Sequence, residues 1–167
     1  MQTILFVPTS SGIGLTSACL GFIRALDYIG LKAGFLKPFS QNITANHESD
    51  DSSSVLAKHA FNLNPPPSID RSRLERVIGD GQLDDLMEEV VAMHQALAEQ
   101  HDAIVCERQG ADNDSRYAEL VHLPIVTALH DKQIRVPRGD IANPDSLVDK
   151  LDIFARDFGG MASERTL

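Results

Sequence analysis

Hydrophobic residues occur along the chain in short continuous runs that alternate with longer helical repeats. The runs at 3–7, 31–39 and 102–107 are continuous and rich in β-forming residues, which is typical of strands buried on both faces of a parallel sheet. A shorter and more charged run at 132–136 has the same form and stops at Pro137. The pattern therefore predicts four strands.

Between these runs the hydrophobic positions recur at helical spacing. The expected helices cover 15–29, 54–63, the stretches 69–78 and 83–100 counted together, 113–129 and 143–158. Pro124 should kink or divide the fourth of them, because proline removes a helical hydrogen bond. The order β-α-β-α-α-β-α-β-α predicts an α/β fold, a doubly wound parallel sheet with helices on both faces. No strand follows the last helix, so we expect the sheet to be truncated before its last strands.

Size and composition narrow the classes of function. The length of 167 residues predicts one domain, 1–167. Hydrophobic residues make up 43% of the chain, but no continuous hydrophobic run approaches the roughly 20 residues of a membrane-spanning helix. The net charge of -9, with scattered Lys and Arg, argues against nucleic-acid binding. Cys19 and Cys106 are too few for a disulfide framework, so a cytoplasmic protein is expected. Cys106, within a strand run, is expected to be an inert core sulfur.

The segment "PTSSGIGLT", 8–16, lies between the first strand and the first helix, where a phosphate-binding loop lies in nucleotide enzymes. Gly12, Gly14 and Thr16 fit such a loop, but Leu15 stands where the phosphate-contacting lysine belongs. Without that ammonium, ATP hydrolysis and phosphoryl transfer are not expected. Two interpretations of the loop stay open, retained anion binding and a tight strand-to-helix connection.

The segment "PTSSGIGLTSACLGFIRALDYIGLKAGFLKPFSQ", 8–41, closely resembles the start of long bacterial phosphate acetyltransferases. The resemblance implies a P-loop-like domain related to dethiobiotin synthetase, in which the loop lysine has likewise become leucine. It continues more loosely through "LMEEVVAMH", "AIVCE" and "DSLVDKLDIFARDFGG", and residues 42–80 match least.

This family resemblance implies that acetyl transfer between acetyl-CoA and phosphate belongs to a separate C-terminal domain, absent from this chain. The chain itself is expected to have no catalytic residue. Its expected roles are an allosteric response to metabolites such as NADH and pyruvate and the assembly of a homo-oligomer. Its expected partners are that C-terminal domain, further copies of the protein and a small anionic metabolite. The candidate ligand-binding residues are Thr9, Ser10, Ser11, Gly12, Gly14, Thr16, Lys37 and Glu107.

The resemblance to dethiobiotin synthetases implies a second set of roles for the candidate site residues. By position, Thr16, Asp51 (or Asp50) and Glu107 would hold Mg²⁺, and Lys37 would lie near the substrate. Hydroxyl and carboxylate oxygens suit Mg²⁺, which is expected here only if a nucleotide binds. The competing interpretation is that Asp50 and Asp51 cap the following helix. Lys37 is equally compatible with a solvated position at a strand end.

Three further features weigh on these expectations. Arg108 stands where the family usually has glycine, and its guanidinium could bind an anion or fill the site with its own charge. The histidines show no metal-ligand spacing and are expected on the surface or on helix flanks; they are His47, His59, His94, His101, His122 and His130. Two alternatives to a regulatory domain remain, an ATP- and Mg²⁺-dependent ligase like dethiobiotin synthetase and a protein-interaction module with an empty cleft.

Overall fold

The computed structural model describes residues 1–9, 12–40, 51–108, 116–129 and 132–136. The strands are β1 (Gln2–Pro8), β2 (Ala33–Leu36), β3 (Ala103–Glu107) and β4 (Lys132–Val136). The helices are α1 (Leu15–Tyr28), α2 (Ser52–Phe61), α3 (Arg71–Gly79), α4 (Leu83–Ala98) and α5 (Arg116–Leu129). The four predicted strands are therefore confirmed, and the expected helix 143–158 lies outside the described residues.

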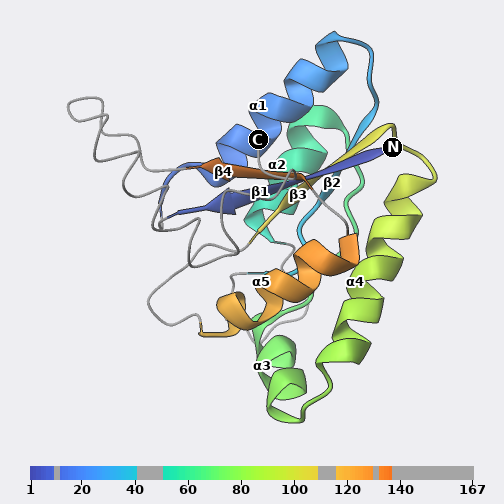
Figure 1. Cartoon of the computed structure of the whole chain (residues 1–167). Helices are drawn as coiled ribbons and strands as arrows, with labels where there is room; N and C mark the ends of the chain where they lie inside the picture. The colour runs from blue at the N-terminus through green and yellow to red at the C-terminus, as the bar shows by residue number, and fades with distance from the viewer. Residues whose placement is uncertain (10–11, 41–50, 109–115, 130–131, 137–167) are drawn as a thin grey trace.

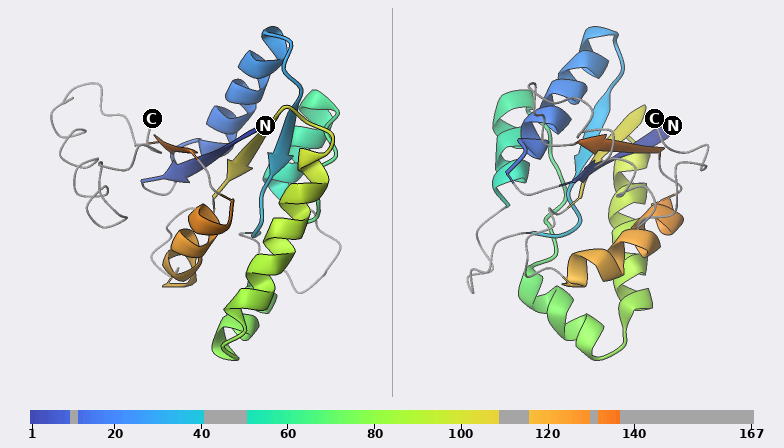
Figure 2. Two further views of the ribbon diagram at one scale, coloured as in Figure 1. Left: turned by 45° about the vertical axis from the view of Figure 1, so that its right-hand side comes forward. Right: turned by 60° about the vertical axis from the view of Figure 1, so that its left-hand side comes forward.

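The strands form one parallel sheet in the order β2-β3-β1-β4. Parallel neighbours need a crossover connection, and the helices supply these crossovers. Figure 1 and Figure 2 show α1 and α2 on one face of the sheet and α3, α4 and α5 on the other. The doubly wound α/β fold is thus confirmed, and the carboxyl ends of β1, β2 and β3 lie along one edge of the sheet.

Alternating side chains of β1 build two separate cores, because successive residues of a strand point to opposite faces. Ile4 and Phe6 pack with Cys19 and Ile23 of α1, whereas Leu5 belongs to the core under α4 and α5. The same alternation on β3 sends Ile104 and Cys106 to the α4 side and Val105 to the α1 side. Burial on both faces explains why these strands have continuous rather than alternating hydrophobicity.

The expected helix count needs correction. The order predicted two helices between the second and third strands, whereas the stretches 69–78 and 83–100 form the separate helices α3 and α4, so the described residues between β2 and β3 contain three. Gly81, with a φ of 72°, separates α3 from α4, because this backbone conformation interrupts a right-handed helix and suits glycine. Pro124 lies inside α5 without dividing it. Of the two effects expected of this proline, division of the helix is therefore wrong, and the continuous helix packs against α4.

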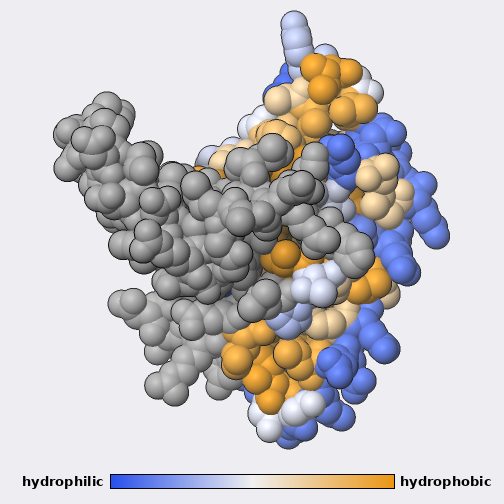
Figure 3. All heavy atoms as spheres, in the orientation of Figure 1, coloured by the Kyte–Doolittle hydropathy of each residue, from blue (hydrophilic) through white to orange (hydrophobic). Residues whose placement is uncertain are grey.

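The outward side of α4 is polar. In Figure 3 polar residues cover the outward side of α4, whose first turn carries Asp84 and Asp85. The opposite side of α4 buries Leu86, Val90 and Leu97. Among the helices of the described residues, none combines the length and the hydrophobicity needed to cross a membrane.

Candidate functional site

The loop after β1 places Leu15 at the start of α1 rather than free in the loop. Gly12 and Gly14 have φ angles of 67° and 73°, and these left-handed conformations explain glycine at both positions. Gly14 precedes the helix without a side-chain cap. The Leu15 side chain is partly buried and packs against the core beneath α1. Leucine therefore belongs to the hydrophobic packing at a position where a phosphate-binding lysine would reach out of the loop.

Thr9, the first predicted ligand-binding residue of the loop, bonds to the neighbouring strand. Its backbone N–H and its Oγ1 both donate to the carbonyl oxygen of Val136, at 3.1 and 3.4 Å. Thr9 thus joins the ends of β1 and β4. Ser10 and Ser11 lie outside the described residues, so their predicted role stays a prediction.

Five polar residues meet at the carboxyl ends of β2 and β3 and the amino ends of α1 and α2. This group, the Lys37 cluster, consists of Thr16, Lys37, Asp51, Ser53 and Glu107. Lys37 directly follows β2, Glu107 ends β3, and the other three lie at the first turns of the two helices. Four of the five were predicted as site residues, and the parallel sheet brings them into direct contact.

Lys37 occupies the centre of the Lys37 cluster. Its Nζ lies 2.8 Å from Oδ1 of Asp51 and 2.9 Å from Oε1 of Glu107, and each of these three side chains is only 3% exposed. Burial alone would lower the pKa of Lys37, but the carboxylates of Glu107 and Asp51 outweigh it and raise that pKa above its usual 10.5. Lys37 is therefore charged, and the idea of a solvated strand-end lysine is wrong.

Asp51 caps α2 and also pairs with Lys37. Its Oδ1 accepts a hydrogen bond from the backbone N–H of Ser53 at 2.9 Å, so Asp51 is the N-cap of α2. Its Oδ2 accepts from Oγ of Ser40 at 3.2 Å. The capping interpretation is confirmed, and the same carboxylate also pairs with Lys37.

Glu107 is held by three donors on one oxygen. Its Oε1 accepts from Lys37, from Oγ of Ser53 at 2.8 Å and from Oγ1 of Thr16 at 3.2 Å. The other oxygen, Oε2, is buried and has no hydrogen-bond partner among the described residues. Ser53, which also accepts from Lys37 at 2.9 Å, was missed from the sequence. Its position two residues after a helix-capping aspartate, near a strand end, was the available signal.

The predicted Mg²⁺ set can be tested against this geometry. Thr16, Asp51 and Glu107 supply oxygens of the kind that Mg²⁺ prefers. The Nζ of Lys37 lies among the same oxygens, and a second cation at that position would meet its charge at close range. The described residues contain no group of three or more His, Cys, Asp or Glu side chains that could hold a metal. The assignment of Mg²⁺ to Thr16, Asp51 and Glu107, expected only with a bound nucleotide, stays a prediction.

Arg108 lies in the other layer. It is 4% exposed and lines a narrow cavity with Phe39, Val121 and Ile125, on the α5 side of the sheet. Glu107 lines the same cavity. Lys37 is the cation that pairs with the carboxylates of the Lys37 cluster, and the effect of Arg108 on a ligand stays a prediction.

His94 lies on the buried face of α4, the helix in which the sequence placed it. His94 of α4 is buried, and its Nε2 lies 2.7 Å from Oγ1 of Thr3 on β1. Burial lowers the pKa of His94 below 6.5. His59 on α2 is exposed, as predicted. His94 therefore belongs to the packing between α4 and the sheet.

Comparison with known proteins agrees with this architecture. A family model described as "AAA domain" matches residues 2–130. A protein named phosphate acetyltransferase from Acinetobacter baylyi is 37% identical over 166 residues, which are 99% of this chain and 23% of that protein. The phosphate acetyltransferase of Pseudomonas aeruginosa is 34% identical over 167 residues, 100% of this chain and 24% of that protein. That of Escherichia coli K12 is 25% identical over 159 residues.

The chain thus spans about a quarter of the length of the curated relatives it matches. The resemblance to a P-loop-like domain of long phosphate acetyltransferases, stated from residues 8–41, is confirmed over nearly the whole chain. With a doubly wound parallel sheet, a loop between β1 and α1 and a family model that matches most of its residues, the chain belongs to the AAA domain family.

Proposed function

We propose that this chain is the amino-terminal domain of a cytoplasmic phosphate acetyltransferase, non-catalytic by itself, which regulates and assembles the enzyme. The similarity to about a quarter of each relative supports a separate location for acetyl transfer. In the whole enzyme that reaction would convert acetyl-CoA and phosphate into acetyl phosphate and CoA. The domain would respond to a small anionic metabolite at the loop residues 9–16 and hold copies of the enzyme together.

One observation carries the non-catalytic assignment: Leu15, at the position of the phosphate-contacting lysine, packs into the core. In agreement with it, Lys37, the cation of the Lys37 cluster, is bound to two carboxylates. Phosphoryl transfer requires positive charge on the terminal phosphates. Here Asp51 and Glu107 compensate the charge of Lys37, so little of it remains for a ligand. A nucleoside triphosphate would have to displace these ion pairs before Lys37 could contact it.

The test uses the full-length enzyme with and without this domain. Acetyl transfer from acetyl-CoA to phosphate should survive removal of the domain, whereas the response of the rate to NADH and pyruvate and the native oligomer should be lost. Light scattering and initial-rate kinetics measure these outcomes. Loss of all acetyl transfer in a truncated protein that remains folded would contradict the proposal.

Calorimetric titration of the chain itself addresses ligands directly. We expect no turnover of ATP in the presence of Mg²⁺, and binding of NADH or pyruvate would identify the effector. If neither binds, regulation is excluded for these two effectors and assembly remains as the role. Micromolar binding of ATP together with its hydrolysis would overturn the non-catalytic assignment.

A second candidate, an ATP-dependent ligase of the dethiobiotin synthetase type, is favoured by the convergence of Thr16, Lys37, Asp51 and Glu107. Wild-type chain should then hydrolyse ATP when the ligase substrates are supplied. Leu15→Lys, with Leu15→Met as the matched control of similar size, separates the alternatives. ATPase activity in Leu15→Lys alone would indicate latent machinery that the wild-type chain does not use.

A further inference from the structure

A second cavity lies beside the Lys37 cluster, between α2 and the segment that follows it. We call it the Lys58 pocket. Its volume is about 170 Å³, and it is lined by Asp51, Ser54, Lys58, Asn64, Pro65, Pro66, Pro67 and Ser68. This volume equals the liquid volume of roughly five or six water molecules. The pocket therefore has room for a small molecule.

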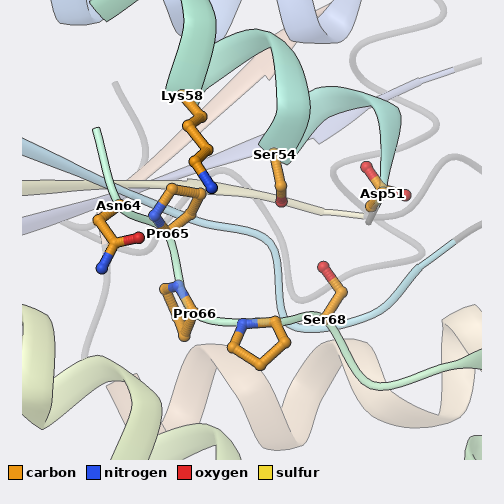
Figure 4. Close-up of a pocket in the computed structure, with 8 residues that line it drawn as sticks. Asp51, Ser54, Lys58, Asn64, Pro65, Pro66 and Ser68 are labelled. Carbon is orange, nitrogen blue, oxygen red and sulfur yellow. The ribbon is translucent and has the colours of Figure 1, made fainter. Parts of the chain in front are cut away.

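Helical spacing places one wall of the pocket on a single side of α2. Residues 51, 54 and 58 follow one another at intervals of three and four, so their side chains share a face. Figure 4 shows the Lys58 ammonium and the Ser54 hydroxyl directed toward the segment 64–68. Both groups therefore face the same cavity.

The opposite wall is built from restrained backbone. Pro65, Pro66 and Pro67 have fixed φ angles, which limits the motion of this segment. At its end, Oγ of Ser68 donates to the carbonyl oxygen of Lys37 at 2.7 Å, and the N–H of Ile69 donates to that of Pro38 at 2.8 Å. These bonds fasten the proline segment to the chain that follows β2. The cavity is thus formed in advance of any ligand.

The polar groups left to a ligand are donors. Oγ of Ser54 is buried, in a residue 7% exposed, and has no hydrogen-bond partner among the described residues. The Lys58 ammonium makes no ion pair or hydrogen bond within the part of the chain that the structure describes. Asp51, the acidic residue of the lining, is already compensated by Lys37. An unsatisfied buried hydroxyl and an uncompensated ammonium favour an anion over a cation.

We propose that the Lys58 pocket binds a small oxyanion, a carboxylate or a phosphate, through Lys58 and Ser54 with Asn64 at the rim. This site is separate from the loop 9–16 and goes beyond the proposed function, because it would bind whether or not the chain regulates an acetyltransferase. Asp51 lines the pocket and also pairs with Lys37, so an occupant would lie next to the Lys37 cluster.

The experiment is a titration of ¹⁵N-labelled chain with sodium phosphate and, separately, with sodium acetate, at constant ionic strength set with sodium chloride. Saturable shifts of the amide signals of Ser54, Lys58 and Asn64 are expected with at least one anion. Saturation by phosphate alone identifies a phosphoryl ligand, and saturation by acetate identifies a carboxylate ligand. Absence of saturable shifts with both anions would overturn the proposal.

Three variants make the test specific to the pocket. Lys58→Met should weaken binding about ten-fold or more, because a charge-assisted contact is lost. Lys32→Met removes an equal charge from an exposed position elsewhere and should leave the affinity unchanged. Ser54→Ala should weaken binding without lowering the unfolding temperature, because the lost hydroxyl has no hydrogen-bond partner among the described residues. Equal weakening by Lys58→Met and Lys32→Met would show a general charge effect and refute the site.

Discussion

At the scale of single residues, Lys37 illustrates how a protein stabilises a buried charge. Lysine is almost never fully buried without a partner, because its ammonium loses its hydration. Asp51 and Glu107 supply two partners, and Ser53 adds a hydrogen bond. One ammonium compensates two carboxylates, so removal of Lys37 leaves both without their cation.

Lys37→Met should therefore lower the free energy of unfolding by about 3–5 kcal/mol, because two buried carboxylates lose their cation. Urea denaturation at pH 7 measures the change. Lys32→Met, at an exposed position, should change it by less than about 0.5 kcal/mol. A cost for Lys37→Met no larger than that of the control would contradict the assigned ion pairs.

The difference in the free energy of unfolding between wild type and Lys37→Met should depend on pH. Folding raises the pKa of Lys37 above 10.5, so its stabilising contribution is present at neutral pH and is lost as the pH rises through the folded-state pKa. The stability difference between wild type and Lys37→Met should narrow above pH 10.5.

In the smaller variant Lys37→Ala, added Mg²⁺ should raise the unfolding temperature more than in wild type, because the oxygens around Lys37 become accessible.

The burial of His94 predicts how the free energy of unfolding changes at acidic pH. Its pKa is lowered by burial, so below about pH 6.5 the unfolded chain binds a proton that the folded chain does not. This linkage decreases the free energy of unfolding as the pH falls, by at most about 1.4 kcal/mol per pH unit. Urea titrations from pH 7 to pH 5 should show a shallower decrease for His94→Gln than for wild type. His59→Gln, at an exposed position of α2, should retain the wild-type slope.

At the scale of elements, the helix starts differ in what they contribute. α2 and α3 both begin after an aspartate whose side chain accepts a backbone N–H, Asp51 from Ser53 and Asp70 from Arg73. Asp51 is buried and also pairs with Lys37, whereas Asp70 lies nearer the surface. The same cap is thus a local feature in α3 and part of the site in α2.

Substitution by asparagine separates these two contributions, because asparagine caps a helix about as well as aspartate but carries no charge. Asp70→Asn should change the free energy of unfolding little, and Asp70→Ala should lower it by about 0.5–2 kcal/mol. Asp51→Asn should lower it by about 1.5–3 kcal/mol through the loss of a charged partner for Lys37. Equal effects of Asp51→Asn and Asp70→Asn in urea denaturation would contradict the structural role of the charge.

At the scale of the whole molecule, one sheet separates two hydrophobic cores. Ile104 of β3 belongs to the core under α4 and α5, and Ile23 of α1 belongs to the core on the other face. Both cores include residues of β1, β2 and β3. Loss of either core would leave one face of the sheet exposed, so the two should unfold together.

Ile104→Val and Ile23→Val test this cooperativity with the same small deletion. Each should lower the free energy of unfolding by about 0.5–1.5 kcal/mol, and the double variant should lower it by the sum, because the side chains share no contact. Circular dichroism and amide hydrogen exchange should report one transition in every variant. Separate transitions for the two faces would show that the cores are independent.

Much of the architecture could be predicted because the signals are local. Continuous hydrophobic runs located β1, β2 and β3 to within a few residues, and helical spacing located α1 and α5. The errors arose where tertiary contacts compete with local preference, as at Pro124, or where a single glycine conformation divides a helical pattern, as at Gly81. The strand order of the sheet had no local signal.

The sequence by itself determined the class of fold, the position of the loop and the replacement of its lysine by Leu15, since these depend on residue type and spacing. Only the tertiary structure decided that Lys37 is buried between Asp51 and Glu107. The contacts of the Lys37 cluster join residues far apart in the chain. Ser53 and Glu107, for example, are 54 positions apart and share a hydrogen bond. The charges of the cluster meet because parallel strands end at one edge of the sheet, and burial there makes pairing necessary.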